Sequence, residues 1–215
     1  MSIPVRVLCI SDIHGKMRTL EKFIERAPSA DLLLVAGDLT NYGDYTQAVA
    51  VIEKLESLGI KILGVPGNCD TEEVIRAMED KKISVHGKKV SYVDLSIVGF
   101  GGSPPTPFST PLEYSEREIE EALKRLEKGD VLLTHAPPKN TPLDKVFVGI
   151  HAGSFSVRKA IESREPLFAV CGHIHEARGV HLLKKTTVVN PGPLFKNYYA
   201  VVDVSDSVSV KLLKL

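Results

Sequence analysis

Side chains that can bind a metal ion stand at the ends of five predicted strands, each just past the last apolar residue. They are Asp12, His14, Asp38, Asn68, His135, His173 and His175. In open α/β sheets, ligands bind beyond the carboxyl ends of the strands, and parallel neighbours present those ends on one edge. We therefore expect these side chains to converge. The alternative, five unrelated polar turns, requires the same coincidence at every strand.

The number and chemistry of these side chains indicate two metal ions. A tetrahedral zinc site takes four protein ligands, or three ligands and a water molecule, so the set is too large for one such site. It suits two ions of higher coordination number that share a bridging carboxylate. Mixed imidazole, carboxylate and amide ligands favour manganese, iron, cobalt, nickel or zinc over calcium, and manganese is the ion that we expect.

Formal charges predict the kind of substrate. Two divalent ions bring about four positive charges, whereas two aspartates and a bridging hydroxide bring about three negative charges. The centre would keep roughly one positive charge, which favours an anionic substrate. Because phosphate is the anionic group most commonly handled by paired metal ions, the sequence predicts a small phosphoester substrate.

Hydrophobic periodicity predicts the elements that must position these side chains. In the first part of the chain, apolar runs alternate with apolar residues spaced by three and four positions, as in amphipathic helices. The pattern predicts strands at 5–10, 32–36 and 60–65 and helices at 17–27 and 45–55. Asp70 and Glu73 predict an N-cap and a capping box for a short third helix. Such alternation is typical of a largely parallel sheet covered on both faces.

The remainder of the chain predicts more strands and fewer helices. Gly101 to Pro111 contains four prolines and is expected to be a loop, whereas Ser115 and Glu118 form a capping box for a helix that continues to about residue 128. A second long loop is expected at 136–153 and a helix at 155–163. Strands are expected at 90–93, 96–100, 131–133, 167–170, 179–183, 186–189, 198–202 and 208–212. We therefore predict an α/β front half, an antiparallel back half, and one domain over residues 1–215 that contains two sheets.

Composition excludes several classes of protein. Hydrophobic residues make up 43% and charged residues 25%, as in an ordinary globular protein, which argues against disorder and a membrane bundle. Lys+Arg and Asp+Glu both number 27, so no basic excess indicates nucleic-acid binding. Three widely spaced cysteines form no disulfide framework, and no signal stretch or membrane span is evident. We expect a cytoplasmic protein with no membrane partner; a homo-oligomer stays open.

The ordered motifs resemble those of calcineurin-like metallophosphoesterases, from about residue 6 to residue 192. They are Asp12-x-His14, Gly37-Asp38, Gly67-Asn68-x-Asp70, His135 and Gly172-His173-x-His175. The resemblance implies an α/β fold, a four-layer α/β/β/α sandwich of two mixed sheets flanked by helices. It also implies two metal sites that share Asp38 as the bridge. The first would comprise Asp12, His14, Asp38 and His175, and the second Asp38, Asn68, His135 and His173.

The chain departs from the common family pattern at Cys69, where a histidine that assists catalysis is usual. Because a thiol is a weak hydrogen-bond donor with an ordinary pKa near 8.5, protonation of the leaving group is in question. A subset of small family members also carries cysteine here, and the short chain is most similar to the small bacterial and archaeal phosphodiesterase branch. His151, flanked by glycines, is a further candidate for phosphate contact; the alternative is a loop histidine that caps or faces water.

The sequence therefore favours a metal-dependent phosphodiesterase in which a bridging metal-bound hydroxide attacks phosphorus. Asn68, His135 and His151 are the candidates for stabilising the added negative charge, and Cys69 is the candidate beside the leaving group. A non-catalytic scaffold with the same fold is the main alternative, although a scaffold would be expected to lack ligands. A phosphomonoesterase or a nuclease is the other alternative.

Overall fold

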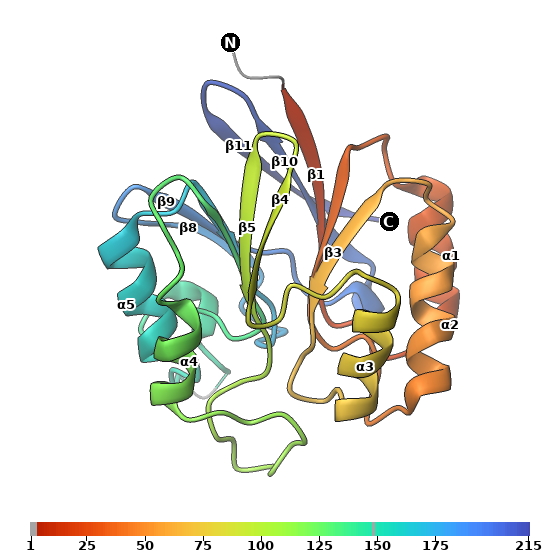
Figure 1. Ribbon diagram of the computed structural model, residues 1–215, viewed down its shortest axis with the longest axis horizontal. Helices are drawn as coiled ribbons and strands as arrows, with labels where there is room; N and C mark the ends of the chain where they lie inside the picture. The colour runs from red at the N-terminus through yellow and green to blue at the C-terminus, as the bar shows by residue number, and fades with distance from the viewer. Residues whose placement is uncertain (1–3, 148) are drawn as a thin grey trace.

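Two β-sheets packed against each other form the centre of the computed structural model, which describes residues 4–147 and 149–215 (Figure 1). The helices within residues 17–80 cover the outer face of one sheet, and the helices within residues 116–164 cover the outer face of the other. The predicted four-layer α/β/β/α sandwich of two mixed sheets is confirmed.

The first sheet has the strand order β11-β10-β1-β2-β3. Its strands are β1 (Val5–Ile10), β2 (Leu32–Ala36), β3 (Lys61–Val65), β10 (Tyr198–Val204) and β11 (Val208–Lys214). Strands β1, β2 and β3 are parallel, whereas β10 runs antiparallel to both β1 and β11. Every residue of β2 is buried because both of its faces are covered, which explains its uninterrupted apolar sequence.

The second sheet has the strand order β4-β5-β6-β7-β9-β8. Its strands are β4 (Lys88–Tyr92), β5 (Leu95–Phe100), β6 (Val131–Thr134), β7 (Phe168–Val170), β8 (Gly179–Leu183) and β9 (Thr186–Asn190). Strands β5, β6, β7 and β9 are parallel, and the outer strands β4 and β8 are antiparallel to their neighbours.

All four predicted strands of the back part exist, and the antiparallel prediction is confirmed for the pairs β8–β9, β10–β11 and β1–β10 but wrong for β9 and β7, which are parallel. Strands β10 and β11 return to the first sheet, and β9 pairs in parallel with β7. An alternating or apolar run indicates a strand but does not specify its neighbour. Because β8 forms the outer strand of a hairpin with β9, β9 is free to pair with β7 on its other edge.

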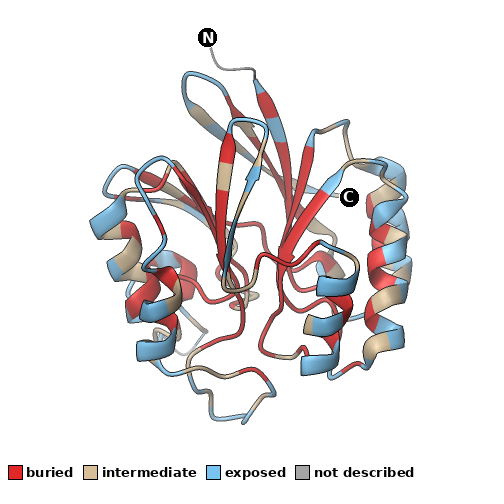
Figure 2. Ribbon diagram, in the orientation of Figure 1, coloured by how far each residue is buried: buried red, intermediate tan, exposed pale blue. Residues whose placement is uncertain are grey.

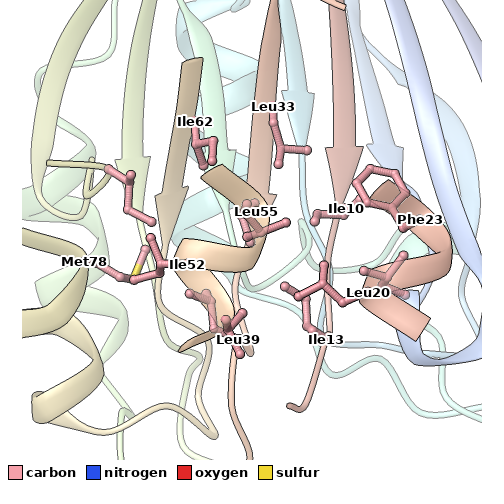
Figure 3. Packing of buried hydrophobic residues seen from close by; sticks show 14 of the residues in the cluster. Ile10, Ile13, Leu20, Phe23, Leu33, Leu39, Ile52, Leu55, Ile62 and Met78 are labelled. Carbon is pink, nitrogen blue, oxygen red and sulfur yellow. The ribbon is translucent and has the colours of Figure 1, made fainter. Parts of the chain in front are cut away.

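Alternate side chains of each central strand enter different cores. In β1, Val7 and Cys9 lie between the two sheets, whereas Leu8 and Ile10 face the helices. The helices on that face are α1 (Met17–Arg26), α2 (Tyr45–Glu56) and α3 (Glu72–Asp80). Figure 3 shows their packing on the sheet at Ile10, Leu20, Phe23, Leu33, Ile52, Leu55 and Met78. Figure 2 shows buried residues along both sheets and exposed residues on the outer sides of the helices.

The other outer face is covered by α4 (Glu116–Leu123) and α5 (Phe155–Arg164). The capping box of Ser115 and Glu118 is confirmed, since both of its hydrogen bonds are present. The helix ends earlier than the predicted residue 128. After Leu123 the chain turns through i to i+3 hydrogen bonds, and the buried Leu126 fills the core from this turn instead of from a further helical turn.

The predicted capping role of Asp70 was wrong. Helix α3 begins after Thr71, and the Asp70 carboxylate instead accepts hydrogen bonds from the backbone N–H groups of Leu39, Thr40 and Gly67 at 2.8–3.0 Å. Asp70 is fully buried, and a buried carboxylate needs hydrogen-bond donors because it has lost its contact with water. The three N–H groups supply these donors. The result is a fixed geometry for the loops that follow β2 and β3.

No helix in the described part of the chain combines the length and the apolar character needed to cross a membrane.

Candidate metal centre

The seven predicted ligands follow the carboxyl ends of β1, β2 and β3 in one sheet and of β6 and β7 in the other. Four of them form a tight group in which each residue offers one ligand atom within 4.8 Å of the others. This group comprises Asp12, His14, Asp38 and His175. Residues far apart in the sequence are therefore neighbours, as the argument from parallel strand ends predicts.

Asp38 connects this group to a second pair of side chains. Its Oδ2 lies 3.5 Å from His14 Nε2 and 3.5 Å from His135 Nε2. His135 Nε2 in turn lies 2.9 Å from Asn68 Oδ1, and the His173 ring lies with its centroid 5.1 Å from that of His135. The geometry brings all seven residues into one cluster with Asp38 in the middle.

Backbone strain is concentrated in this cluster. Four of the seven candidate ligands are non-glycine residues with positive φ, namely Asp12, His14, Asp38 and His173. Such residues are uncommon and gather at functional sites, where surrounding contacts hold them. Here the N–H groups of Ile13 and His14 both donate to the carbonyl oxygen of Asp38 at 2.8 and 2.9 Å, which joins the first two loops.

The glycines of the motifs are required by close packing. A Cβ atom on Gly67 would lie 1.9 Å from Asp38 Oδ1, and one on Gly172 would lie 1.7 Å from Ser11 Oγ. Neither contact is possible for a real side chain. The glycine before Asn68 and the glycine before His173 therefore allow the loops to approach closely enough for their ligand atoms to meet.

The polar atoms of the cluster fit a cation. His135 Nδ1 lies 2.7 Å from the Ala36 carbonyl oxygen and must donate to it, so in the neutral ring Nε2 carries only a lone pair. That lone pair faces Asn68 Oδ1 and the Asp38 carboxylate, which also accept. In addition, Asp12 Oδ2 is buried with no hydrogen-bond partner among the described residues. A divalent cation would satisfy each of these atoms.

The pKa shifts of His14, His173 and Asp38 agree with this chemistry. Burial lowers the pKa of His14 to about 4 and that of His173 to about 3. Both imidazoles are therefore neutral near pH 7 and have a free lone pair. Burial, with the charges of Asp12 and Asp70, raises the pKa of Asp38 to about 7, so its ionised form lacks a compensating positive charge.

A cavity of about 270 Å³ opens beside the first group of ligands. It is lined by His14, Lys16, Asn41, His175 and Phe195. The Phe195 ring packs edge-on against both histidines, with centroids 5.5 Å from His14 and 5.0 Å from His175. Lys16, Asn41 and Phe195 were missed by the sequence argument. The Asn190-Pro191-Gly192-Pro193 turn just before Phe195 was the available signal, because it brings the Phe195 N–H to the Asp12 carbonyl oxygen at 3.3 Å.

Cys69 lies beside the cluster but cannot serve as a strong acid or as a thiolate. Its backbone N–H donates to Asp38 Oδ1 at 2.8 Å, and its Sγ lies 3.7 Å from Asn68 Nδ2. Burial and the negative charge of Asp38 raise the pKa of the Cys69 thiol, so it stays neutral. Its backbone therefore orients Asp38, while its side chain offers a weak donor.

His151 and His86 have contacts of their own. His151 Nδ1 lies 2.6 Å from Oδ1 of the buried Asp144, so the described geometry matches a histidine that fixes its loop, and phosphate contact by His151 stays a prediction. His86 accepts a hydrogen bond from the Gly101 N–H at 2.9 Å and stacks on Phe100, which gives it a structural role.

Comparisons with known proteins agree with the motifs and the fold. The family model described as Calcineurin-like phosphoesterase matches residues 5–177. Uncharacterized protein MJ1162 of Methanocaldococcus jannaschii is 42% identical over 205 residues, which cover 91% of this chain and 90% of that protein. Phosphodiesterase YfcE of Escherichia coli K12 is 32% identical over 77 residues, 32% of this chain and 41% of YfcE. The crystal structure of TT1561 of Thermus thermophilus is similar with a TM-score of 0.82 and 22% identity over 99% of both chains, a likeness of fold.

Proposed function

The chain belongs to the calcineurin-like phosphoesterase family of metal-dependent phosphoesterases, and on that premise we propose that it is a dinuclear phosphodiesterase acting on small phosphoesters. The position of Asp38 carries the proposal. One oxygen of this buried carboxylate lies at equal distance, 3.5 Å, from the Nε2 atoms of His14 and His135. A carboxylate between two sets of ligands is what a shared bridge between two cations requires.

The proposal assigns a set of ligands to each ion. The first ion would be held by Asp12, His14, Asp38 and His175, and the second by Asp38, Asn68, His135 and His173. When bound, the ions would supply Lewis-acid activation of the phosphate and of the attacking water. The donor set favours manganese, with nickel, iron, cobalt or zinc as substitutes.

The chain's own groups fix the geometry of these ligands before any ion arrives. The Ala36 carbonyl oxygen holds the His135 ring with its Nε2 lone pair toward Asn68, and the Cys69 N–H holds one oxygen of Asp38. Ligands that are oriented in advance lose little entropy on binding. With His135 Nδ1 donating to Ala36 and Asn68 Nδ2 donating to Thr110, these two residues would act as metal ligands, and the ions would stabilise the developing negative charge on the phosphate.

Diester specificity rests on two observations. The named relative YfcE is a phosphodiesterase, and Cys69 stands where a stronger proton donor is usual. We propose that the chain belongs to the small phosphodiesterase branch that carries the Gly-Asn-Cys-Asp motif. Because the neutral Cys69 thiol donates weakly, diesters with a stable leaving group should be the better substrates.

Hydrolysis assays on purified, metal-depleted protein test the proposal. The protein is loaded in turn with manganese, nickel, cobalt and zinc and offered bis(4-nitrophenyl) phosphate and 4-nitrophenyl phosphate. We expect metal-dependent turnover with a higher kcat/KM for the diester. Equal or faster turnover of the monoester would contradict the diester assignment, and tight metal binding without turnover of either ester would favour a non-catalytic scaffold.

A further inference from the structure

The loop between β5 and α4 reaches the metal centre at Asn68. The Leu112 N–H donates to the Asn68 backbone carbonyl oxygen at 3.2 Å, and Asn68 Nδ2 donates to Thr110 Oγ1 at 3.0 Å. These two contacts hold both the backbone and the side chain of a proposed ligand. The proline-rich loop of residues 101–111 is therefore more than a connection, because it touches the amide that faces His135.

Glu113 organises this loop through one oxygen atom. Its Oε1 accepts from Thr106 Oγ1 at 2.6 Å, from Thr110 Oγ1 at 2.7 Å and from the Thr110 N–H at 2.8 Å. Partial burial alone would raise the pKa of Glu113, but these hydrogen bonds lower it overall. An ionised carboxylate can only accept, so each of the three contacts has a fixed direction.

The direction of one hydrogen bond determines the next. A hydroxyl group has a single proton, and the proton of Thr110 is donated to Glu113. Toward Asn68, Thr110 Oγ1 can therefore only accept, which requires the NH₂ group of the Asn68 amide to face it. The amide oxygen must then point the other way, toward His135 Nε2 at 2.9 Å.

Without this control the metal-free site would favour the opposite orientation. In a neutral His135 ring, Nε2 carries a lone pair because Nδ1 donates to the Ala36 carbonyl oxygen. A reversed Asn68 amide would donate Nδ2–H to that lone pair and form a good hydrogen bond, whereas the observed orientation opposes two acceptors. A reversed amide offers nitrogen instead of oxygen to a metal ion, and an amide nitrogen with two protons is not a ligand.

We propose that Thr110 and Glu113 are positioning residues that hold the Asn68 amide with its oxygen toward the metal centre. This inference rests on the proposed function, because it assumes that Asn68 is a ligand of the second ion. Neither residue is part of the ligand set. Their effect on activity would act entirely through the affinity of that second site.

Metal titration of four proteins tests the inference: the unaltered chain, Thr110→Val, Thr110→Ser and Glu113→Gln. Valine keeps the shape of threonine but cannot accept from Asn68, whereas serine keeps the hydroxyl. Glutamine keeps an oxygen for the Thr110 N–H but, without the negative charge, accepts the Thr110 hydroxyl proton less strongly, which weakens control of the Asn68 amide. Isothermal titration with Mn²⁺ should show the second ion bound roughly 10- to 100-fold more weakly in Thr110→Val and Glu113→Gln. Thr110→Ser should bind as the unaltered chain does.

Two further readouts separate the outcomes. Thermal unfolding of the metal-free proteins measures any purely structural effect of the loop, and electron paramagnetic resonance of the Mn²⁺-loaded proteins reports whether two ions are coupled. The inference would be overturned if Thr110→Val bound the second ion as tightly as the unaltered chain, or if Thr110→Ser bound it as weakly as Thr110→Val. Either result would still be compatible with two bound ions in the unaltered chain. Only one ion in the unaltered chain would instead contradict the second metal site itself.

Discussion

Replacing Asp38 with asparagine measures how much the buried, ionised carboxylate lowers the free energy of unfolding of the metal-free protein. Asp38 is 2% exposed, and its pKa rises from 3.8 to about 7 through burial and the charges of Asp12 and Asp70. Because ionisation is harder in the folded state, the folded chain is destabilised once the unfolded chain has lost its proton. A shift of about 3 pKa units at about 1.36 kcal/mol per unit corresponds to about 4 kcal/mol.

The sign of the effect depends on pH. Below about pH 4 both states hold the Asp38 proton, so Asp38→Asn should change the free energy of unfolding little. As the pH rises toward 7 the unaltered chain loses up to about 4 kcal/mol, whereas the asparagine variant does not. Asparagine keeps the size of the side chain and an oxygen that can accept from the Cys69 N–H. The metal-free variant should therefore be the more stable protein at about pH 8.

Urea unfolding at about pH 4 and about pH 8, with chelator or with Mn²⁺, measures these differences. With Mn²⁺ the order should reverse, because only the unaltered chain has the carboxylate that serves both ions. The variant Asp206→Asn, at an exposed position, is the matched control. Its free energy of unfolding should equal that of the unaltered chain at both pH values, with chelator and with Mn²⁺. A metal-free Asp38→Asn protein that is less stable than the unaltered chain at the higher pH would refute the reasoning, and so would equal stabilisation of both proteins by Mn²⁺.

The remaining predictions use other members of the site and one histidine outside it. His173→Ala and His175→Ala should each reduce metal content, measured by elemental analysis, from two ions toward one; two tightly bound ions in either variant would contradict the ligand partition. Cys69→His should raise kcat/KM for unactivated alkyl diesters more than for aryl diesters, by up to roughly 10²-fold, the low end of what a positioned acid contributes; an unchanged ratio would mean that position 69 does not assist the leaving group. Burial lowers the pKa of His86 from 6.5 to about 4, so the unfolded chain takes up its proton first and stability is lost as the pH falls from 6.5 to about 4. His86→Asn keeps an acceptor for the Gly101 N–H and should reduce this loss of unfolding free energy by about 3 kcal/mol, measured by urea unfolding at about pH 4. An identical acid dependence in both proteins would show that the pKa of His86 is the same in the folded and the unfolded chain.

The candidate site could be predicted from sequence because its residues follow a rule about strand ends. Each of Asp12, Asp38, Asn68 and His135 follows an apolar run closely, and parallel strands place those positions on one edge. The rule predicts that these side chains lie close together even when the conformations of the loops that carry them are unknown. It does not reveal Phe195 or Asn41, since these side chains reach the cavity from a short 3₁₀ helix (Leu194–Lys196) and from a loop, neither of which is long enough to show periodicity.

The errors in the fold have a common physical origin. The Asp70 motif matches a capping box, but a buried site with three backbone donors competes with a solvent-exposed helix end. In the same way, the apolar pattern of β9 is satisfied by any covered sheet position, so it does not determine the pairing with β7. The Thr110 and Glu113 contacts were also invisible, because the direction of a hydrogen bond depends on atoms that only the folded loop brings together.

The number of Mn²⁺ ions bound at saturation, measured by calorimetry with electron paramagnetic resonance of the same sample, tests the central claim most directly. An Asp38 bridge predicts two ions per chain with an exchange-coupled spectrum, because one carboxylate contacts both. One ion per chain, or two ions with an uncoupled spectrum, would contradict the account.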